Sequence, residues 1–258
     1  MSSILYAVQN GVATITLNRP KVYNSFNREM ALACQQALDR AEQDSEVRAI
    51  ILTGSGKAFC AGQDLQEVSD PNGPTLRTIL QEHYNPIVTR IRAIEKPIIG
   101  AVNGVAAGAG ANIALACDLT IAVQSASFIQ AFSKIGLIPD SGGTYFLPRL
   151  IGMQRATALI MLGDKCPAEE AQRIGMIYRC LPLEEFEEAV ATLSQTLANM
   201  PTKGLGLSKR ALNAGLENNL AQQLVVEDQL QTIAAQTYDY KEGVQAFLEK
   251  RKPVFKGA

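Results

Sequence analysis

The N-terminal part of the chain alternates apolar and polar residues with the period of two that is typical of β-strands. Two such runs, Ile4–Val8 and Val12–Leu17, are separated by Asn10-Gly11, a dipeptide that readily adopts the positive φ angles of a tight turn. This pattern predicts a β-hairpin. From about Asn27 to Gln43 the apolar residues recur at helical spacing, and Asn27 can cap the start of that helix.

The middle of the chain alternates short apolar runs with helical patterns. Short apolar runs are typical of buried strands, and strands separated by helices indicate layered α/β units. The runs that predict strands are Ala49–Thr53, Ile98–Val102, Leu119–Val123 and Ser127–Phe132, and those that predict helices are Thr75–Ile94 and Ala109–Ala116. We therefore expect an α/β fold.

Beyond Gly142 the pattern is almost wholly helical, and one apolar run, Ile177–Leu181, predicts a strand within it. Proline fits the first turn of a helix, because the N–H that it lacks has no acceptor there. Three prolines stand where helices can begin: Pro167, Pro182 and Pro201. We expect an α/β core over residues 1–200 and a helical C-terminal region over residues 201–258.

The composition is that of a well-packed globular protein. Of the 258 residues, 47% are hydrophobic and 19% are charged, which argues against disorder. The 24 basic and 25 acidic residues give a net charge of −1, so we expect no general attraction to nucleic acid or to anionic membranes. The uncharged stretch Ile98–Cys117 contains Asn103, Asn112 and four glycines, which favours a buried strand, turn and helix over a membrane span.

Cysteine and histidine usage favours a reducing compartment and argues against a metal site. The five cysteines are widely spaced without a CxxC, and His83 is the single histidine. This spacing fits reduced thiols better than a disulfide framework or a structural zinc site. The N-terminus lacks the basic region of a signal peptide, so we predict a cytoplasmic protein.

Two glycine-rich loops follow apolar strands and match neither nucleotide-binding motif. The stretch Gly54–Lys57 lacks the upstream glycine of a phosphate loop, and Ile113 stands where a dinucleotide fingerprint needs its third glycine. The loops Ala61–Asp64 and Gly108–Gly110 can each start a helix, where free N–H groups bind anions. Two such groups aimed at one point would form an oxyanion hole, although tight packing is the ordinary reason for glycines.

Asp140 lies in the stretch IGLIPDSGGT and is open to two interpretations. It precedes a predicted helix start near Gly142, so it can be an N-cap. It also stands near the apolar residues Phe132, Leu137 and Ile138 in the sequence, and loss of hydration there would raise the pKa of its carboxyl toward that of a useful base.

Five segments taken together resemble the enoyl-CoA hydratase/isomerase family, also called the crotonase superfamily. They are LNRPKVYNSF, ILTGSGKAFCAGQDL, KPIIGAVNGVAAGAGANIALACDLTIA, IGLIPDSGGT and FLEKRKPVF, and the similarity runs nearly end to end. The resemblance implies a crotonase-like spiral of ββα units with a C-terminal helical trimerisation region, assembled as a homotrimer or a dimer of trimers. It also implies an acyl-CoA thioester as substrate, with coenzyme A as part of that substrate and no separate cofactor.

The resemblance further implies roles for individual positions. The backbone N–H groups of Gln63 and Ala109 correspond to the two oxyanion donors, with Ala109 in place of the usual glycine. Lys21 and Val22 match a loop that contacts CoA, and Lys250 matches a lysine near the CoA phosphates. The other positions expected to contact the substrate are Ala61, Asp64, Leu65, Tyr84, Asn112 and Phe132. For Asp64, which stands beside the oxyanion loop, bracing of that loop is the favoured role.

Departures from the family pattern decide which reaction the resemblance implies. Hydratases of the family use two glutamates where this chain has Asn112 and Phe132, and neither of these is a carboxylate base. Asp140 stands where dienoyl-CoA isomerases and aryl-CoA dehalogenases carry their working aspartate, and the segments look closest to the isomerases of phenylacetate breakdown. Those enzymes convert ring-1,2-epoxyphenylacetyl-CoA to its oxepin, shift 3-enoyl to 2-enoyl-CoA double bonds, or do both. We therefore expect an isomerase in which Asp140 moves a proton while the oxyanion donors hold an enolate.

Other functions stay open at this point. The chain can be an enoyl-CoA hydratase, another acyl-CoA lyase or hydrolase of the same family, or a catalytically silent acyl-CoA binding protein. A catalytic His83 is disfavoured, because the base histidine of the dehalogenases falls at Asn85 and helix positions two apart do not share a face. Tyr84 and Asn85 instead can line the acyl pocket.

Overall fold

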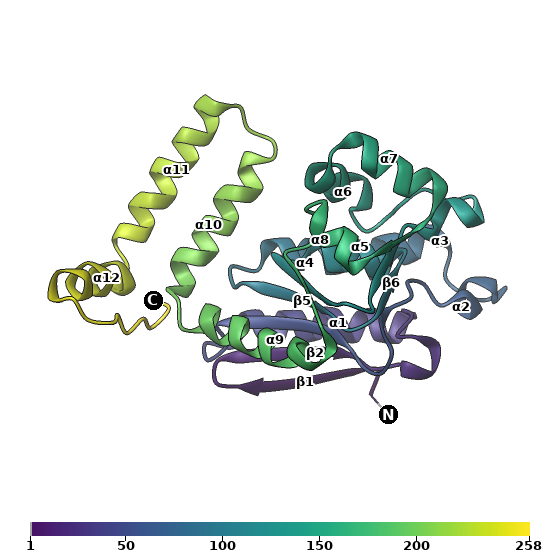
Figure 1. Ribbon diagram of the computed structural model, residues 1–258, viewed down its shortest axis with the longest axis horizontal. Helices are drawn as coiled ribbons and strands as arrows, with labels where there is room; N and C mark the ends of the chain where they lie inside the picture. The colour runs from purple at the N-terminus through teal and green to yellow at the C-terminus, as the bar shows by residue number, and fades with distance from the viewer. Residues whose placement is uncertain (1) are drawn as a thin grey trace.

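Two sheets of mostly parallel strands form the core of the structure, a computed structural model that describes residues 2–258 (Figure 1). The strands are β1 (Ile4–Gln9), β2 (Val12–Leu17), β3 (Ala49–Gly54), β4 (Ala58–Cys60), β5 (Ile98–Val102), β6 (Val105–Ala107), β7 (Leu119–Val123), β8 (Ser127–Ile129), β9 (Lys165–Pro167) and β10 (Arg179–Leu181). The larger sheet has the order β1-β2-β3-β5-β7-β10 and the smaller one the order β4-β6-β8-β9. This mixed arrangement confirms the expected α/β fold.

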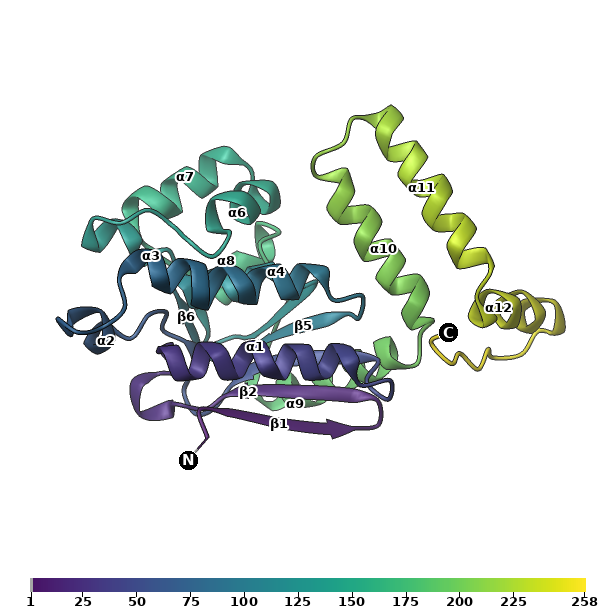
Figure 2. The same cartoon turned by 180° about the vertical axis from the view of Figure 1, so that it is seen from behind.

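Helices cover both faces of the larger sheet. The core helices are the 3₁₀-helices η1 (Pro20–Val22) and η3 (Ala131–Ile135), the π-helix η2 (Ile79–Tyr84), and the α-helices α1 (Arg28–Gln43), α2 (Leu65–Ser69), α3 (Leu76–Thr78), α4 (Asn85–Ala93), α5 (Ala109–Ala116), α6 (Gly143–Ile151), α7 (Met153–Leu162), α8 (Ala168–Arg173) and α9 (Leu183–Ala198). Helix α1 packs against β1 and β2, and α9 packs against β2, β3 and β7 on the opposite face (Figures 1 and 2). The strands between them are therefore shielded from water on both sides.

Several elements form where the local pattern predicts them. Strands β1 and β2 pair antiparallel across Asn10 and Gly11, whose φ angles are 50° and 77°. Helix α1 follows Asn27, and the side chain of Asn27 accepts a hydrogen bond from the N–H of Met30 at 3.0 Å. The predicted bounds of β5, α5 and β7 are confirmed to the residue.

The helix expected from Thr75 to Ile94 is wrong as one continuous α-helix, because it divides into α3, the π-helix η2 and α4. Pro86 lies in the first turn of α4 and has no N–H to donate to the carbonyl of Glu82. The side-chain Nε2 of Gln35 donates to that carbonyl instead, at 2.7 Å. A wider π turn next to a proline is one way in which a helix accommodates the lost hydrogen bond.

The strand expected over Ser127–Phe132 is also too long. Strand β8 ends at Ile129, and the chain then turns into η3, which carries Phe132 and closes at Gly136 with a φ of 73°. Strand β10 begins two residues later than expected, and β9 was not expected, because three residues are too few to show a periodic pattern. The three prolines, in contrast, stand directly before α8, α9 and α10 (Thr202–Gly215).

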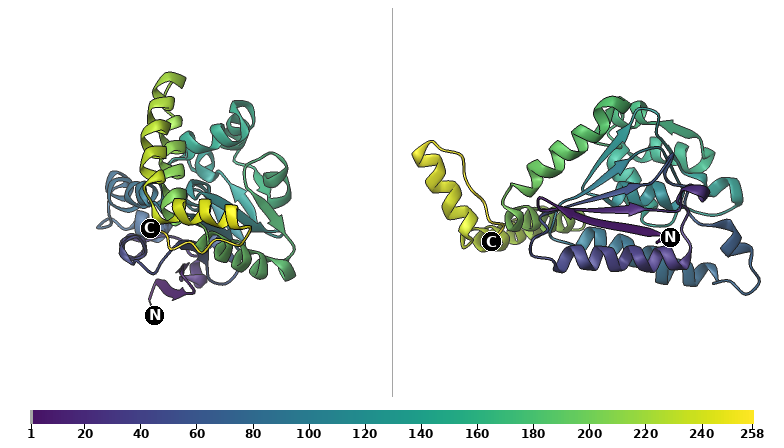
Figure 3. Two further views of the ribbon diagram at one scale, coloured as in Figure 1. Left: turned by 90° about the vertical axis from the view of Figure 1, so that its left-hand side faces the viewer. Right: turned by 90° about the horizontal axis from the view of Figure 1, so that it is seen from below.

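The last helices, α10, α11 (Leu220–Ala235) and α12 (Tyr238–Glu249), extend from one end of the core (Figure 3). Lys209 anchors α10, because its buried Nζ donates to the carbonyl of Ile91 at 2.7 Å and to Oδ2 of Asp118 at 2.8 Å. Large apolar side chains stay exposed on these helices: Leu212, Leu220, Leu224, Val225, Phe247 and Leu248. Within residues 2–258 no helix is both long enough and apolar enough to cross a membrane.

Candidate active site

The smaller sheet brings the two predicted glycine-rich loops and the segment after β8 to one edge. Strand β4 pairs in parallel with β6, with Cys60 opposite Ala106, and β6 pairs in parallel with β8, with Ala107 opposite Ile129. Because the carboxyl ends of parallel strands meet at the same edge of a sheet, the loops that follow them lie side by side. These loops carry Gln63, Ala109 and Phe132.

The direction of the Gln63 N–H is set by the carbonyl of the same peptide. The carbonyl of Gly62 accepts the N–H of Phe26 at 2.7 Å. In a trans peptide the N–H points opposite to the carbonyl, so the N–H of Gln63 points away from Phe26. Gly62 has a φ of 94°, and a Cβ there would lie 2.9 Å from the carbonyl oxygen of Ala107 and 3.6 Å from the nitrogen of Ala109. The two loops therefore touch where only glycine fits.

The N–H of Ala109 belongs to the first turn of α5, where backbone donors have no acceptor within the helix. Gly108, with φ 53° and ψ −128°, makes the turn that a side chain would prevent, so Ala109 itself is helical. Alanine in place of the family glycine is thus compatible with the backbone. Neither Gln63 nor Ala109 donates its N–H to an acceptor within residues 2–258, so both donors are available to a ligand.

Asp140 does not cap helix α6, so the capping interpretation is wrong. The residue at the N-cap is Gly142, and no side chain caps the helix. Oδ1 of Asp140 accepts a hydrogen bond from the hydroxyl of Ser141 at 2.8 Å, and the Asp140 carbonyl accepts the N–H of Gly143 at 2.8 Å. Helix capping therefore does not account for the presence of a carboxylate at this position.

Burial raises the pKa of the Asp140 carboxyl above its usual value, and the Ser141 hydroxyl opposes that rise. The direction agrees with the prediction, but two of the three expected causes are wrong. Leu137 and Ile138 are 40% and 80% exposed and point into solvent, whereas Phe132 is buried. The exposed Leu137 and Ile138 therefore do not account for the loss of hydration, and Phe132 is the one expected residue that is buried.

Asn112 lies beneath Asp140. It is 1% exposed, its Nδ2 donates to the carbonyl of Asp140 at 2.8 Å, and its Oδ1 accepts from Nε2 of Gln130 at 2.8 Å. Both polar atoms of Asn112 are engaged within the protein. This arrangement gives the side chain a role within the protein, and the expected contact of Asn112 with the substrate stays a prediction.

Tyr84 supports the oxyanion loop from the interior. Its side chain is 1% exposed, and its hydroxyl donates to Oε1 of Gln63 at 2.9 Å. Burial is the main cause that holds the pKa of Tyr84 well above its usual value, and the carboxylates of Asp140 and Glu67 add to the shift. Tyr84 therefore stays protonated, and its contact is with Gln63 and not with an open pocket wall.

Asp64 braces the same loop. Its Oδ2 accepts from Nη2 of Arg19 at 2.8 Å, and its Oδ1 accepts the N–H of Gln66 at 3.0 Å, which caps α2. The structure gives this side chain the bracing role, and the expected contact of Asp64 with the substrate stays a prediction.

The remaining predicted residues fall into two places. Lys21 and Val22 lie on η1, which is linked to the oxyanion loop because the N–H of Ala61 donates to the carbonyl of Tyr23 at 2.9 Å. Lys21, Ala61 and Leu65 are exposed at this end, and Val22 is half-buried. Lys250 follows α12, at the opposite end of the molecule from α2 (Figure 1). A single chain does not bring Lys250 to the site.

His83 is fully buried and faces α1. Its Nε2 lies 3.5 Å from Nη1 of Arg28, and its Nδ1 has no partner within residues 2–258. Burial lowers the pKa of His83, so the ring is neutral at physiological pH. Asn85 is exposed. Neither residue provides a base.

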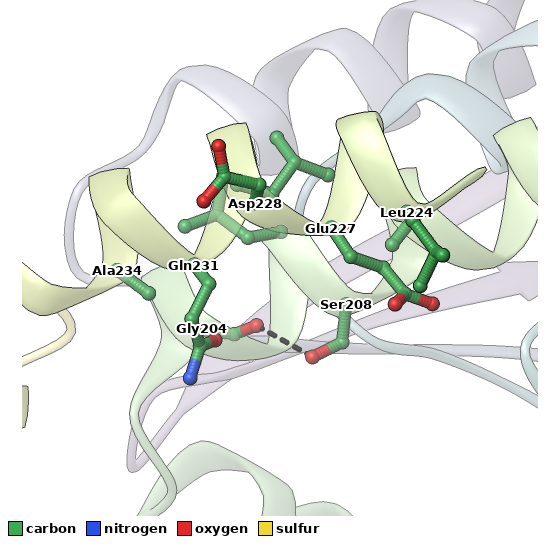
Figure 4. Close-up of a pocket in the computed structure, with 10 residues that line it drawn as sticks. Gly204, Ser208, Leu224, Glu227, Asp228, Gln231 and Ala234 are labelled. Atoms are coloured by element: carbon green, nitrogen blue, oxygen red, sulfur yellow. Dashed lines mark hydrogen bonds between the residues drawn. The ribbon is translucent and has the colours of Figure 1, made fainter. Parts of the chain in front are cut away.

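A groove of about 490 Å³ between α10 and α11 lies elsewhere and contains none of the predicted site residues (Figure 4). Its wall includes Ser208, whose hydroxyl donates to the carbonyl of Gly204 at 2.9 Å, and Glu227 and Asp228 (Figure 4). In the part of the chain that the structure describes, no three His, Cys, Asp or Glu side chains are grouped to hold a metal ion.

Sequence reasoning missed Ser141 and Gln130, although both lie close to predicted residues. Ser141 directly follows Asp140, and the short Asp-Ser-Gly-Gly sequence is a signal for a turn that brings the hydroxyl back to the carboxylate. Gln130 has no comparable signal, because its partner Asn112 is distant in the sequence.

Comparisons with known proteins find similar sequences and structures over nearly the whole chain. The family model of enoyl-CoA hydratase/isomerase matches residues 7–258. The chain is 48% identical to the 1,2-epoxyphenylacetyl-CoA isomerase of Escherichia coli, over 100% of this chain and 99% of that protein. It is 37% identical to the trans-2-decenoyl-[acyl-carrier-protein] isomerase of Streptococcus mutans, over 98% of each protein. The crystal structure of an enoyl-CoA hydratase from Bacillus anthracis superimposes with a TM-score of 0.91 at 34% identity, covering 99% of this chain and 100% of that one.

Proposed function

Because the chain belongs to the enoyl-CoA hydratase/isomerase family, we propose that it is an acyl-CoA isomerase whose single acid–base group is Asp140. One observation carries the proposal: Asp140 has a partly buried carboxylate that has a raised pKa and caps no helix, and its backbone carbonyl accepts a hydrogen bond from Asn112 on α5, the helix whose first residue, Ala109, offers its N–H. A group that must first take and then return a proton works best when its pKa is near the working pH.

The proposed reaction on a 3-enoyl-CoA is a proton transfer between two carbons. Oδ2 of Asp140 removes a proton from C2, and the electrons of that C–H bond form an enolate whose oxygen accepts the N–H groups of Gln63 and Ala109. The enolate oxygen then re-forms the carbonyl, the double bond moves to C2–C3, and C4 takes the proton back from Asp140. Asp140 is ionised again at the end of the reaction, as it was at the start, so the reaction needs no further cofactor. Each oxyanion donor contributes about a hundredfold or more in rate.

Hydration is disfavoured by the residues at positions 112 and 132. Asn112 and Phe132 supply no carboxylate to activate water, and Asn112 is enclosed by Gln130 and Asp140. An Asp140 that shuttles a proton needs no water in the reaction. Isomerisation is therefore the reaction that this set of side chains supports best.

For the physiological acyl group we propose ring-1,2-epoxyphenylacetyl-CoA, the substrate in the name of the Escherichia coli relative. The same removal of a proton next to the thioester gives an enolate whose electrons can open the epoxide on the way to the oxepin. A 3-enoyl-CoA shares the acidic C2 proton, which makes it a suitable probe.

The test is incubation with a 3-enoyl-CoA in deuterated water. We expect the wild type to move the double bond and, when the proton on Asp140 exchanges with solvent before its return, to incorporate deuterium. Asp140→Ala should lose both. Asp164→Ala, which changes an exposed aspartate between α7 and β9, should behave as wild type. Migration that persists in Asp140→Ala, or rapid hydration of crotonyl-CoA by the wild type, would contradict the proposal.

We also propose that the chain assembles as a trimer or a dimer of trimers through α10–α12. The exposed apolar side chains of these helices, such as Leu212, Leu220 and Phe247, support this assembly, because contiguous apolar surface is typical of an interface. Light scattering that gives the mass of one chain would contradict it.

A further inference from the structure

A chain of hydrogen bonds between buried side chains ends on the backbone of Asp140. Nε2 of Gln130 donates to Oδ1 of Asn112, and Nδ2 of Asn112 donates to the carbonyl oxygen of Asp140, each at 2.8 Å. Gln130 is 4% exposed and Asn112 is 1% exposed. Because water cannot replace a lost partner at such sites, each bond matters more than one at the surface.

The direction of this amide chain is fixed by its last member. A carbonyl oxygen only accepts, so Asn112 must present its NH₂ group to Asp140 and its oxygen to Gln130. Gln130 must then present its own NH₂ group. An ionised carboxylate at position 112 has no donor, and it would place a negative charge against the Asp140 carbonyl.

The backbone that follows Asp140 packs against the same contact between Asn112 and the Asp140 carbonyl. The N–H of Gly143 donates to the Asp140 carbonyl at 2.8 Å, so this oxygen is held by two donors. A Cβ on Gly143 would lie 2.3 Å from Nδ2 of Asn112, which means that Asn112 lies directly against this backbone. The position of Asp140 therefore depends on the shape and the donors of Asn112.

We propose that Gln130 and Asn112 are positioning residues, which hold Asp140 at the reacting carbon through this polarised amide chain. An amide at position 112 is thus a requirement for a working acid at position 140. The inference rests on the proposed function of Asp140 as the acid–base group. Neither amide touches the reacting atoms, and both act through the backbone that carries the carboxylate.

The experiment measures kcat and KM for 3-enoyl-CoA isomerisation in Gln130→Met and in Asn112→Asp. Methionine keeps nearly the volume of glutamine without its donor, and aspartate keeps the size of asparagine without its NH₂ group. We expect kcat to fall about tenfold or more, because small displacements of a reacting group are costly. We expect KM to change less than about twofold, because no CoA-contacting position is altered.

Thr120→Val is the matched control. The hydroxyl of Thr120, which is also buried, donates to the carbonyl of Ala114 on the same helix α5 at 2.8 Å, and it has no link to Asp140. This variant loses a comparable buried hydrogen bond, so we expect a lower midpoint of thermal unfolding and an unchanged kcat.

The outcomes separate this inference from the proposed function. If the wild type isomerises and Asp140→Ala does not, but folded Gln130→Met and Asn112→Asp keep the wild-type kcat, the inference is overturned and the proposed function stands. If the wild type shows no isomerisation, the proposed function fails, and crystal structures decide the inference. A shifted Asp140 in either variant supports it, and an unmoved Asp140 in both overturns it.

Discussion

The hydroxyl of Ser141 donates a hydrogen bond to Oδ1 of Asp140 at 2.8 Å from a backbone with a φ of 52°. A positive φ costs a residue other than glycine about 1 kcal/mol or more. Oδ1 is thereby occupied, and Oδ2 has no hydrogen-bond partner within residues 2–258. The strained turn therefore selects which oxygen of Asp140 is free to take a proton.

Ser141→Gly should move the acidic limb of the kcat/KM profile to higher pH. Glycine adopts this φ without strain, so the variant removes the hydroxyl and little else. The hydroxyl lowers the pKa of Asp140, and its loss removes the larger of the two hydrogen bonds that oppose the effect of burial. The base then stays protonated to higher pH. Kinetics from acid to neutral pH measure this change.

Asn10→Gly is the matched control for that variant. Asn10 has a φ of 50° in the turn between β1 and β2, far in sequence from Asp140. The same relief of strain should leave the pH profile in place. An acidic limb that is identical in wild type and Ser141→Gly would show that the hydroxyl does not tune Asp140.

Asp140→Asn should be less active but more stable at neutral and alkaline pH. The pKa of Asp140 is raised in the folded protein by burial, so its contribution to stability is complete below the unfolded pKa of about 3.9 and is lost as pH rises through the folded pKa. Asparagine does not ionise and avoids that loss. The unfolding midpoint of the variant should exceed that of the wild type at about pH 8, and the difference should shrink toward about pH 4. A difference that does not vary with pH would argue against an ionised, buried Asp140.

Gly62→Ala should lower kcat by about a hundredfold, the usual effect of losing one oxyanion donor. The new Cβ would lie 2.9 Å from the carbonyl oxygen of Ala107, at a φ of 94°, so the peptide that carries the Gln63 N–H must move. Gly152→Ala carries a similar strain, at a φ of 78°, but a Cβ there meets nothing within 4 Å. That control should lose stability and keep its kcat. Equal activities in the two variants would contradict the assignment of the Gln63 N–H as an oxyanion donor.

Local sequence patterns predicted the elements whose determinants are local. The turn at Asn10-Gly11 and the cap at Asn27 depend on residues within four positions of each other. Where a distant partner intervenes, the predictions were wrong. The π-helix depends on Pro86 together with Gln35, which approaches the Glu82 carbonyl from α1.

The sequence by itself determined the fold class, the two glycine-rich loops and the one acid left once glutamate is absent at positions 112 and 132. The α/β class and the loops follow from residue type and short-range spacing, whereas the choice of Asp140 follows from the resemblance to the enoyl-CoA hydratase/isomerase family. Only the tertiary structure decided that Leu137 and Ile138 face water and that Asn112 donates a hydrogen bond to the carbonyl of Asp140. It also decided that Lys250 lies away from the site in a single chain. The exposure of a side chain and its hydrogen-bond partners depend on residues that are distant in sequence. They are therefore set only when the sheets and helices pack together.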